Sequence, residues 1–112
     1  MIQVSPNVFV ETGLHACNLG IVTTKEGVTM IDTPMRPTDA IKWLDEVKKK
    51  GEIKYLINTE EHLDHSQSSW FFPGILVTHV ETRRKMTRIP MKEVTDMVKE
   101  IDPAGLPPHD TK

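Results

Sequence analysis

The chain has 112 residues, 38% of them hydrophobic and 27% charged, which suits one soluble domain with a single core rather than a disordered chain. A net charge of −2 and the lack of a basic stripe argue against nucleic-acid binding, and no apolar run is long enough to span a membrane. No signal peptide is visible at the N-terminus and Cys17 is the only cysteine, so we expect a cytoplasmic protein without an internal disulfide.

Short strands dominate the first third of the chain. We predict strands at residues 7–10, 19–24 and 28–31, where β-branched and apolar residues lie between turn residues. Residues 25–27 form a hairpin loop that ends in glycine, where a positive φ is needed. A loop this short makes the two strands that it joins antiparallel neighbours.

A helix follows, capped by Thr38 or Asp39 and running to about Lys50. Its spacing of apolar residues predicts a buried face formed by Ile41, Leu44 and Val47. The next strand, 53–57, leads into a polar turn that carries the residues of greatest interest.

The rest of the chain is mainly helical. The predicted elements are a short helix at 66–72, a strand at 75–78, and helices at 81–88 and from Pro90 to Ile101, followed by an irregular tail at 102–112. The last helix is expected to bury Val94, Met97, Val98 and Ile101. Strands interleaved with helices predict an α/β (α+β) domain, with a mixed sheet covered by helices on one face. Strands 53–57 and 75–78 should be parallel neighbours.

Four potential metal ligands lie in the turn after strand 53–57, namely Glu60, His62, Asp64 and His65. The first three alternate, so an extended chain places them on one side, whereas His65 needs a bend to join them. A bend would pair Glu60 with His62 and Asp64 with His65 at two neighbouring metals. Imidazole and carboxylate ligands suit zinc, iron or manganese, which make hydroxide available at neutral pH. The alternative is a solvated polar turn without metal.

The stretch Glu60-Glu61-His62-Leu63-Asp64-His65 resembles the H-x-H-x-D-H signature of the metallo-β-lactamase-fold superfamily. Its surroundings are also similar to the family: the segments 18–22 and 27–33 resemble the opening hairpin, and 75–79 resembles the strand after the signature. The resemblance extends from about Asn7 to Arg88. It implies the N-terminal half of the αββα fold, with Asp32 supporting the metal loop.

The resemblance also assigns roles to the four residues. Glu60 and His62 would serve one metal, Asp64 and His65 would serve the other, and Asp64 would hold or orient the attacking water. Glu60 stands where the family usually has histidine. Zinc is the favoured metal, and the carboxylate of Glu60 leaves room for iron or manganese as alternatives.

The family's later ligands have no counterpart after His65, so residues 1–112 are expected to form a single partial domain. Its open sheet face would be apolar and would require a partner. The partner would be the second half of the fold, as a separate chain, a cleaved segment or a second copy of this chain. A truncated sequence is the other explanation.

The leading functional hypothesis is a metal-dependent hydrolase that acts on a small-molecule ester, thioester, lactone or amide once a second half completes it. One alternative is a non-catalytic or degenerate metal-binding half-domain that acts through protein pairing. Another is a diiron redox protein of the same fold, because carboxylate-rich sites suit iron.

Overall fold

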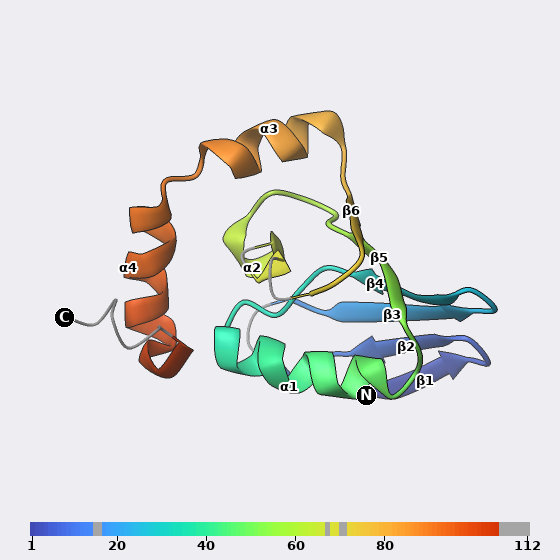
Figure 1. The fold of residues 1–112 in the computed structure, drawn as a ribbon. Coiled ribbons are helices and arrows are strands. Elements are labelled where there is room, and N and C mark those ends of the chain that lie inside the picture. The colour runs from blue at the N-terminus through green and yellow to red at the C-terminus, as the bar shows by residue number, and fades with distance from the viewer. Residues whose placement is uncertain (15–16, 67, 70–71, 106–112) are drawn as a thin grey trace.

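The computed structural model describes residues 1–14, 17–66, 68–69 and 72–105, and the side chains of Leu63 and Asp64 lie outside this description. The described chain forms a twisted sheet with helices beside it (Figure 1). In chain order the elements are β1 (Ile2–Ser5), β2 (Val8–Glu11), β3 (Leu19–Thr24), β4 (Gly27–Ile31), α1 (Pro37–Lys48), β5 (Ile53–Ile57), α2 (Leu63–Ser66), β6 (Ile75–Val77), α3 (Val80–Arg88), α4 (Met91–Ile101) and the 3₁₀ helix η2 (Pro103–Gly105).

The six strands lie in the sheet in the same order as in the chain, from β1 to β6. Strands β1 to β4 are antiparallel neighbours, whereas β4, β5 and β6 are parallel. The difference follows from the connections, since tight turns join β1 to β2 and β3 to β4, whereas a helix lies between β4 and β5 and another between β5 and β6. The predicted mixed sheet and the parallel pairing of β5 with β6 are both confirmed.

Helix α1 covers one face of the sheet and closes the hydrophobic core. The buried strand residues of this core include Phe9, Leu19, Ile21, Val28, Met30, Ile53 and Leu56. From α1, Ala40, Trp43 and Val47 pack against them. The prediction of Ile41 on this face was wrong, because its side chain is 55% exposed. The large Trp43 centres the buried stripe on positions 40, 43 and 47, which leaves Leu44 at its border and Ile41 outside it.

The start of α1 also differs from the prediction. Its N-cap is Arg36, which makes no side-chain capping bond, so the predicted caps Thr38 and Asp39 were wrong. The buried carboxylate of Asp102, just after α4, accepts hydrogen bonds from the Thr38 backbone N–H at 3.0 Å and from the Thr38 hydroxyl at 2.8 Å. A carboxylate at a helix N-terminus satisfies an otherwise unpaired N–H and complements the helix dipole. The residue after α4 is thereby tied to the start of α1.

Three further boundaries differ. The structure adds β1, which pairs with β2 and was not predicted. The β3–β4 turn contains only residues 25–26, because Thr24 already pairs with Gly27. The short helix predicted at 66–72 instead occupies Leu63–Ser66, inside the ligand turn, and part of the predicted segment lies outside the described residues. Helices α3 and α4 lie within a residue of the predicted positions, and α4 buries Val94 and Val98.

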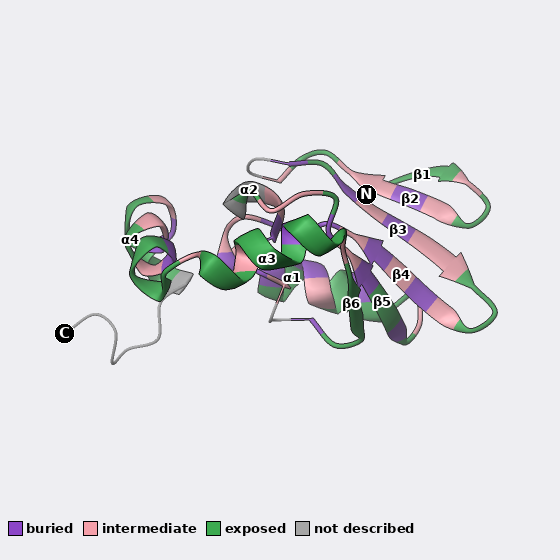
Figure 2. Cartoon of the chain, turned by 90° about the horizontal axis from the view of Figure 1, so that it is seen from above, coloured by how far each residue is buried: buried purple, intermediate pink, exposed green. Residues whose placement is uncertain are grey.

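The sheet face opposite α1 is open, as expected from the sequence. No helix lies over β1–β4 in the view of Figure 2. Neighbouring strands align apolar residues on this face in two rows, and all of these residues are half-buried or exposed. The rows are Val8, Val22, Thr29, Tyr55 and Ile75, and Val10, Gly20, Ile31, Ile57 and Val77.

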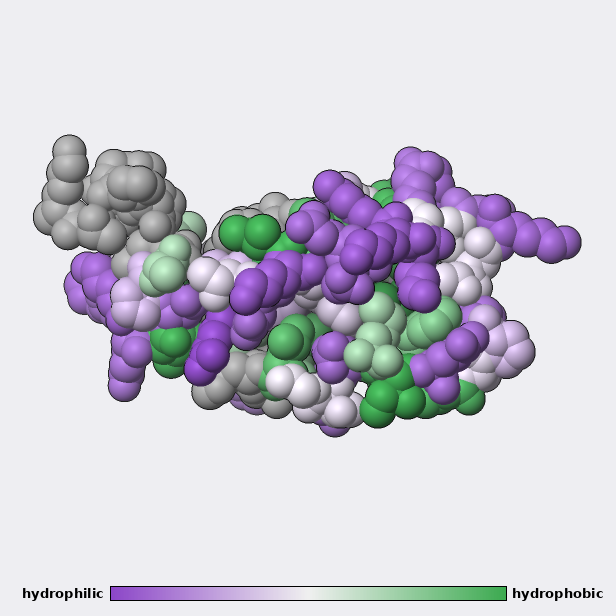
Figure 3. Space-filling view, turned by 90° about the horizontal axis from the view of Figure 1, so that it is seen from below, coloured by the Kyte–Doolittle hydropathy of each residue, from purple (hydrophilic) through white to green (hydrophobic). Residues whose placement is uncertain are grey.

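The opposite side of the molecule has a different surface. A hydrophilic band crosses this side in Figure 3, where the outer face of α1 carries its lysines and acids, and hydrophobic atoms lie toward the β1 end. At that end Ile2 and Val4 of β1 are more than half exposed. None of the described helices is long and apolar enough to cross a membrane.

Candidate metal centre

The ligand turn starts at one edge of the sheet, where the parallel strands β4 and β5 both end. Asp32 follows β4, and Asn58 and Thr59 follow β5. Pairing of Ile31 with Ile57 brings the two strand ends together. Polar groups that follow parallel strands thus meet at the carboxyl edge, the usual position of sites in such sheets.

Asp32 organises this edge. It is 4% exposed and has a φ of +59°, a conformation that aspartate tolerates better than most residues. Its Oδ1 accepts a hydrogen bond from the Thr59 backbone N–H at 2.7 Å. Its Oδ2 lies 2.6 Å from the Thr59 hydroxyl and 2.9 Å from His65 Nδ1. One buried carboxylate therefore fixes the start of the turn and the ring of its last histidine.

The backbone of α2 is held just as closely. The His65 carbonyl accepts from Thr33 N–H and from the Thr33 hydroxyl, both at 3.0 Å, and from Asn58 Nδ2 at 3.3 Å. The Ser66 hydroxyl contacts the carbonyl oxygens of Glu61 and His62 at 2.9 and 3.1 Å. These bonds fold the ligand turn back on itself, so residues 60–66 form a compact loop instead of an extended segment.

Three of the four predicted ligands come together in this loop. Glu60 Oε1 lies 2.8 Å from His62 Nδ1 and 3.2 Å from His65 Nε2. The side chains of His62 and Glu60 are 70% and 40% exposed, whereas that of His65 is 24% exposed. Glu60 thus contacts both histidines, where the sequence suggested that it would pair with His62 alone. The Asp64 side chain lies outside the described residues, so its pairing with His65 stays a prediction.

The residue types in the turn are those that bind metals, but the described side chains are not arranged as a metal site. Among them, no three His, Cys, Asp or Glu side chains form a group that could hold a metal ion. Glu60 is instead hydrogen-bonded to the His62 ring and lies within ion-pair distance of His65 Nε2. Asp32 hydrogen-bonds to His65 Nδ1 and leaves His65 Nε2 as the nitrogen that would bind a metal. This arrangement is common for metal-binding histidines. Imidazole and carboxylate together fit zinc or iron.

A contact from α3 to the turn was not predicted from the sequence. Lys85 Nζ lies 3.2 Å from Glu61 Oε1 and connects α3 to the loop beside Glu60. The pKa of Glu61 is lowered, first by a hydrogen bond from its own backbone N–H and then by Lys85. The two residues are 24 positions apart, so no helical or strand spacing could have indicated this pair.

Comparison with known proteins shows the fold and no closer relationship. No protein-family model and no curated protein matches the sequence. A solved B3 metallo-β-lactamase with an active-site glutamic acid is similar at 23% identity and a TM-score of 0.61, over 74% of this chain and 34% of its own. A motif mutant of the Cronobacter sakazakii metallo-β-lactamase has 19% identity and a TM-score of 0.66, over 78% and 37%. The metallo-β-lactamase FIM-1 from Pseudomonas aeruginosa, solved in a mono-zinc form, has 13% identity and a TM-score of 0.64, over 77% and 44%.

Coverage in these alignments is unequal on the two sides. The match includes about three quarters of this chain, but only about a third to under a half of each solved protein. The matched part of this chain therefore corresponds to only a part of each solved fold. Over most of its length, the chain has part of the metallo-β-lactamase fold.

Proposed function

We propose that this chain provides the first half of a metal-dependent hydrolase. The observation that supports this most directly is the bond between Asp32 and His65 Nδ1, which orients His65 Nε2 toward Glu60 beside His62. A buried carboxylate behind a histidine is the support that metal-binding imidazoles usually have. A merely solvated turn would not require Asp32 to be buried with three hydrogen-bonding partners at its two oxygens.

In this proposal Glu60, His62, Asp64 and His65 hold the metal, with zinc favoured and iron or manganese as alternatives. The metal supplies Lewis-acid chemistry and makes hydroxide accessible at neutral pH. Asp64 orients the attacking water, Asp32 fixes the His65 ring, and Glu60 takes the position of a histidine ligand. A related fold with an active-site glutamic acid makes a carboxylate at this position chemically reasonable. The substrate class is a small ester, thioester, lactone or amide.

The second half of the fold is the proposed partner. The chain spans about 34–45% of the length of the solved proteins that it resembles, which supports the proposal that residues 1–112 form one partial domain. The open sheet face with Val22, Ile31 and Tyr55 is the surface that the second half would cover. A separate chain, a cleaved segment or a second copy of this chain could each provide that cover.

Metal analysis tests the proposal. Purified protein should bind zinc stoichiometrically, and Glu60→Ala and His62→Ala should each weaken zinc binding measured by competition with a chromogenic chelator. Glu46→Ala is the matched control, because Glu46 is an exposed carboxylate on α1 that pairs with Lys49 far from the turn in sequence. Zinc binding that is unchanged in both turn variants, or absent from the parent protein, would contradict the proposal.

The second candidate is a half-domain that pairs with another protein and has no catalytic activity. It is favoured by the contacts of the Glu60 carboxylate with the His62 and His65 rings. Glu60 must give up these contacts before it can bind a metal. This candidate predicts no hydrolysis of ester, thioester or lactone substrates with zinc, manganese or iron present, even after the partner half is added. Hydrolysis that disappears in Asp64→Ala would exclude it.

A further inference from the structure

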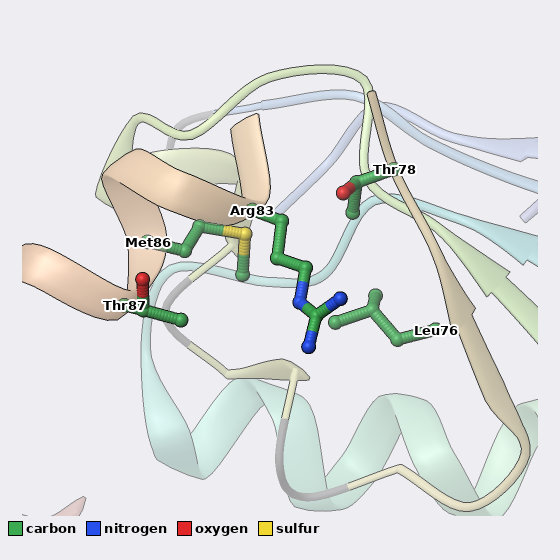
Figure 4. A pocket seen from close by; sticks show the side chains of 5 residues that line it. All are labelled: Leu76, Thr78, Arg83, Met86 and Thr87. Carbon is green, nitrogen blue, oxygen red and sulfur yellow. The ribbon is translucent and has the colours of Figure 1, made fainter. Parts of the chain in front are cut away.

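A hollow lies on the helix side of the sheet, at its β6 edge. Its volume is about 460 Å³, within the range of small-molecule sites, and its walls come from β6 with the residue after it and from α3. Figure 4 shows the side chains that line it, Leu76, Thr78, Arg83, Met86 and Thr87. The described residues that line the hollow include none of Glu60, His62 and His65 from the candidate metal centre.

The hollow exists because β6, at the edge of the sheet, is less covered by helices than β5. Leu76 pairs with Leu56 on the neighbouring strand, yet Leu56 is 2% exposed and Leu76 is 46% exposed. Helix α3 places Arg83, Met86 and Thr87 on one side at helical spacing, and this side faces β6 (Figure 4). Only Thr78 and His79 separate β6 from α3, and the His79 side chain caps α3 by accepting the Glu81 N–H at 3.0 Å.

Arg83 gives the hollow its polarity. The two residues after it have carboxylate partners, since Arg84 pairs with Glu81 and Lys85 with Glu61. Within the described part of the chain, no ion pair is formed by Arg83, whose guanidinium extends toward Leu76 in Figure 4. The hydroxyls of Thr78 and Thr87 each donate to a backbone carbonyl at 2.9 Å. The Arg83 fork is therefore the donor that this wall can offer to a ligand.

We propose that this hollow binds a small amphipathic carboxylate. The carboxylate pairs with Arg83, whose planar fork can donate two parallel hydrogen bonds to it. The apolar part of the ligand lies against Leu76 and Met86, which are otherwise left uncovered. A neutral ligand would leave the cation without a counter-charge, and none of the described residues that line the hollow is acidic, so none would attract a cationic ligand.

Octanoate is a suitable probe. 1-Octanol has the same alkyl chain without the carboxylate, and acetate has the carboxylate without the long chain. Binding is followed by NMR on the purified protein, using the methyl signals of Leu76 and Met86, in the presence of a chelator so that the metal centre plays no part. Arg83→Gln should weaken octanoate binding about tenfold or more, the loss expected for hydrogen bonds between charged groups. Arg84→Gln is the matched control, because it removes a neighbouring cation that already has a partner, and it should leave octanoate affinity within about twofold.

The proposal is supported if octanoate shifts the Leu76 and Met86 signals, octanol and acetate bind at least tenfold more weakly, and only Arg83→Gln reduces affinity. If octanol bound as tightly as octanoate, Arg83 would not recognise the carboxylate. If acetate bound as tightly as octanoate, the apolar wall would not contribute to binding. Octanoate that fails to bind at millimolar concentration, or that binds both variants alike, overturns the proposal. Arg83 is exposed and forms no described ion pair, so its substitution should not disturb folding.

Discussion

Replacement of Asp32 should destabilise the protein and weaken metal binding at the same time. In Asp32→Ala, the Thr59 N–H, the Thr59 hydroxyl and His65 Nδ1 lose their common acceptor. Hydrogen bonds to a charged group contribute about 1.5–3 kcal/mol each, but Thr59 is exposed and water can replace part of the loss. Alanine at a φ of +59° adds about 1 kcal/mol of strain. We expect a combined loss of about 2–4 kcal/mol.

Two further substitutions of Asp32 separate these contributions. Asp32→Gly removes the carboxylate but accepts a positive φ, so it should be about 1 kcal/mol more stable than Asp32→Ala. Asp32→Asn tolerates the same φ and keeps one acceptor oxygen for the Thr59 backbone N–H, but the amide nitrogen then occupies the Oδ2 position and cannot accept from His65 Nδ1. The asparagine variant should therefore lose the least stability and still release the His65 ring.

Urea unfolding in the presence of a chelator measures the stability change without metal, and zinc competition on the folded variants measures the effect on the site. Zinc affinity should fall about 10–100-fold in Asp32→Asn, as is usual when the partner of a ligating histidine is lost. If Asp32→Asn unfolds at the same urea concentration as the parent and binds zinc equally well, the reasoning about this carboxylate is refuted. Loss of stability with unchanged zinc affinity would restrict Asp32 to a structural role.

Two other contacts make separate predictions. Asp102→Ala should destabilise the protein by about 1 kcal/mol in thermal or urea unfolding, because Thr38 loses its acceptor at the start of α1. Asp102→Asn keeps an acceptor oxygen for Thr38, so it should destabilise the protein less than Asp102→Ala. The pKa of Glu61 lies below its usual value, so its contribution to stability is present above the ordinary glutamate pKa and is lost as the pH falls through the lowered value. Lys85→Gln should raise the Glu61 pKa in an NMR titration, and an unchanged pKa would show that the contact with Lys85 does not form in solution.

Much of the sheet could be predicted from local sequence. Strand 53–57 was predicted with the bounds found for β5, because its apolar run is bounded by turn residues on both sides. Gly27 was predicted to need a positive φ and has a φ of 142°. Such features depend on neighbouring residues in the chain, which is the information that a single sequence contains.

The arrangement of the site was less predictable. Alternation of Glu60, His62 and Asp64 describes an extended chain, but the bonds from Thr33 and Asn58 to the His65 carbonyl bend the segment into α2. Glu60 consequently meets both histidines. These bonds join residues 7 to 32 positions apart, and their formation depends on the pairing of β4 with β5. The ligand types could be identified from the sequence, whereas their pairing required the tertiary structure.

Helix capping failed as a prediction for a related reason. Thr38 and Asp39 are residue types that favour helix N-caps, and local preference assigned the cap to them. The structure provides the acceptor from Asp102, which is 64 positions away from Thr38. Residue propensity predicts the cap that nearby residues favour. In the structure, the buried carboxylate of Asp102, just after α4, takes the place of that local cap.

The strict sequential order of the strands has a consequence for how the chain reaches this structure. Each strand pairs with the strand that precedes it in the chain, so the sheet can grow from β1 to β6 without waiting for a later segment. Such short-range pairing keeps loop-closure costs low and favours rapid folding. During synthesis, domains fold from the N-terminus as the chain emerges, and this sheet can form in the same direction. The contact between Asp102 and Thr38 joins residues 64 positions apart, so it can form only after α4 has been synthesised.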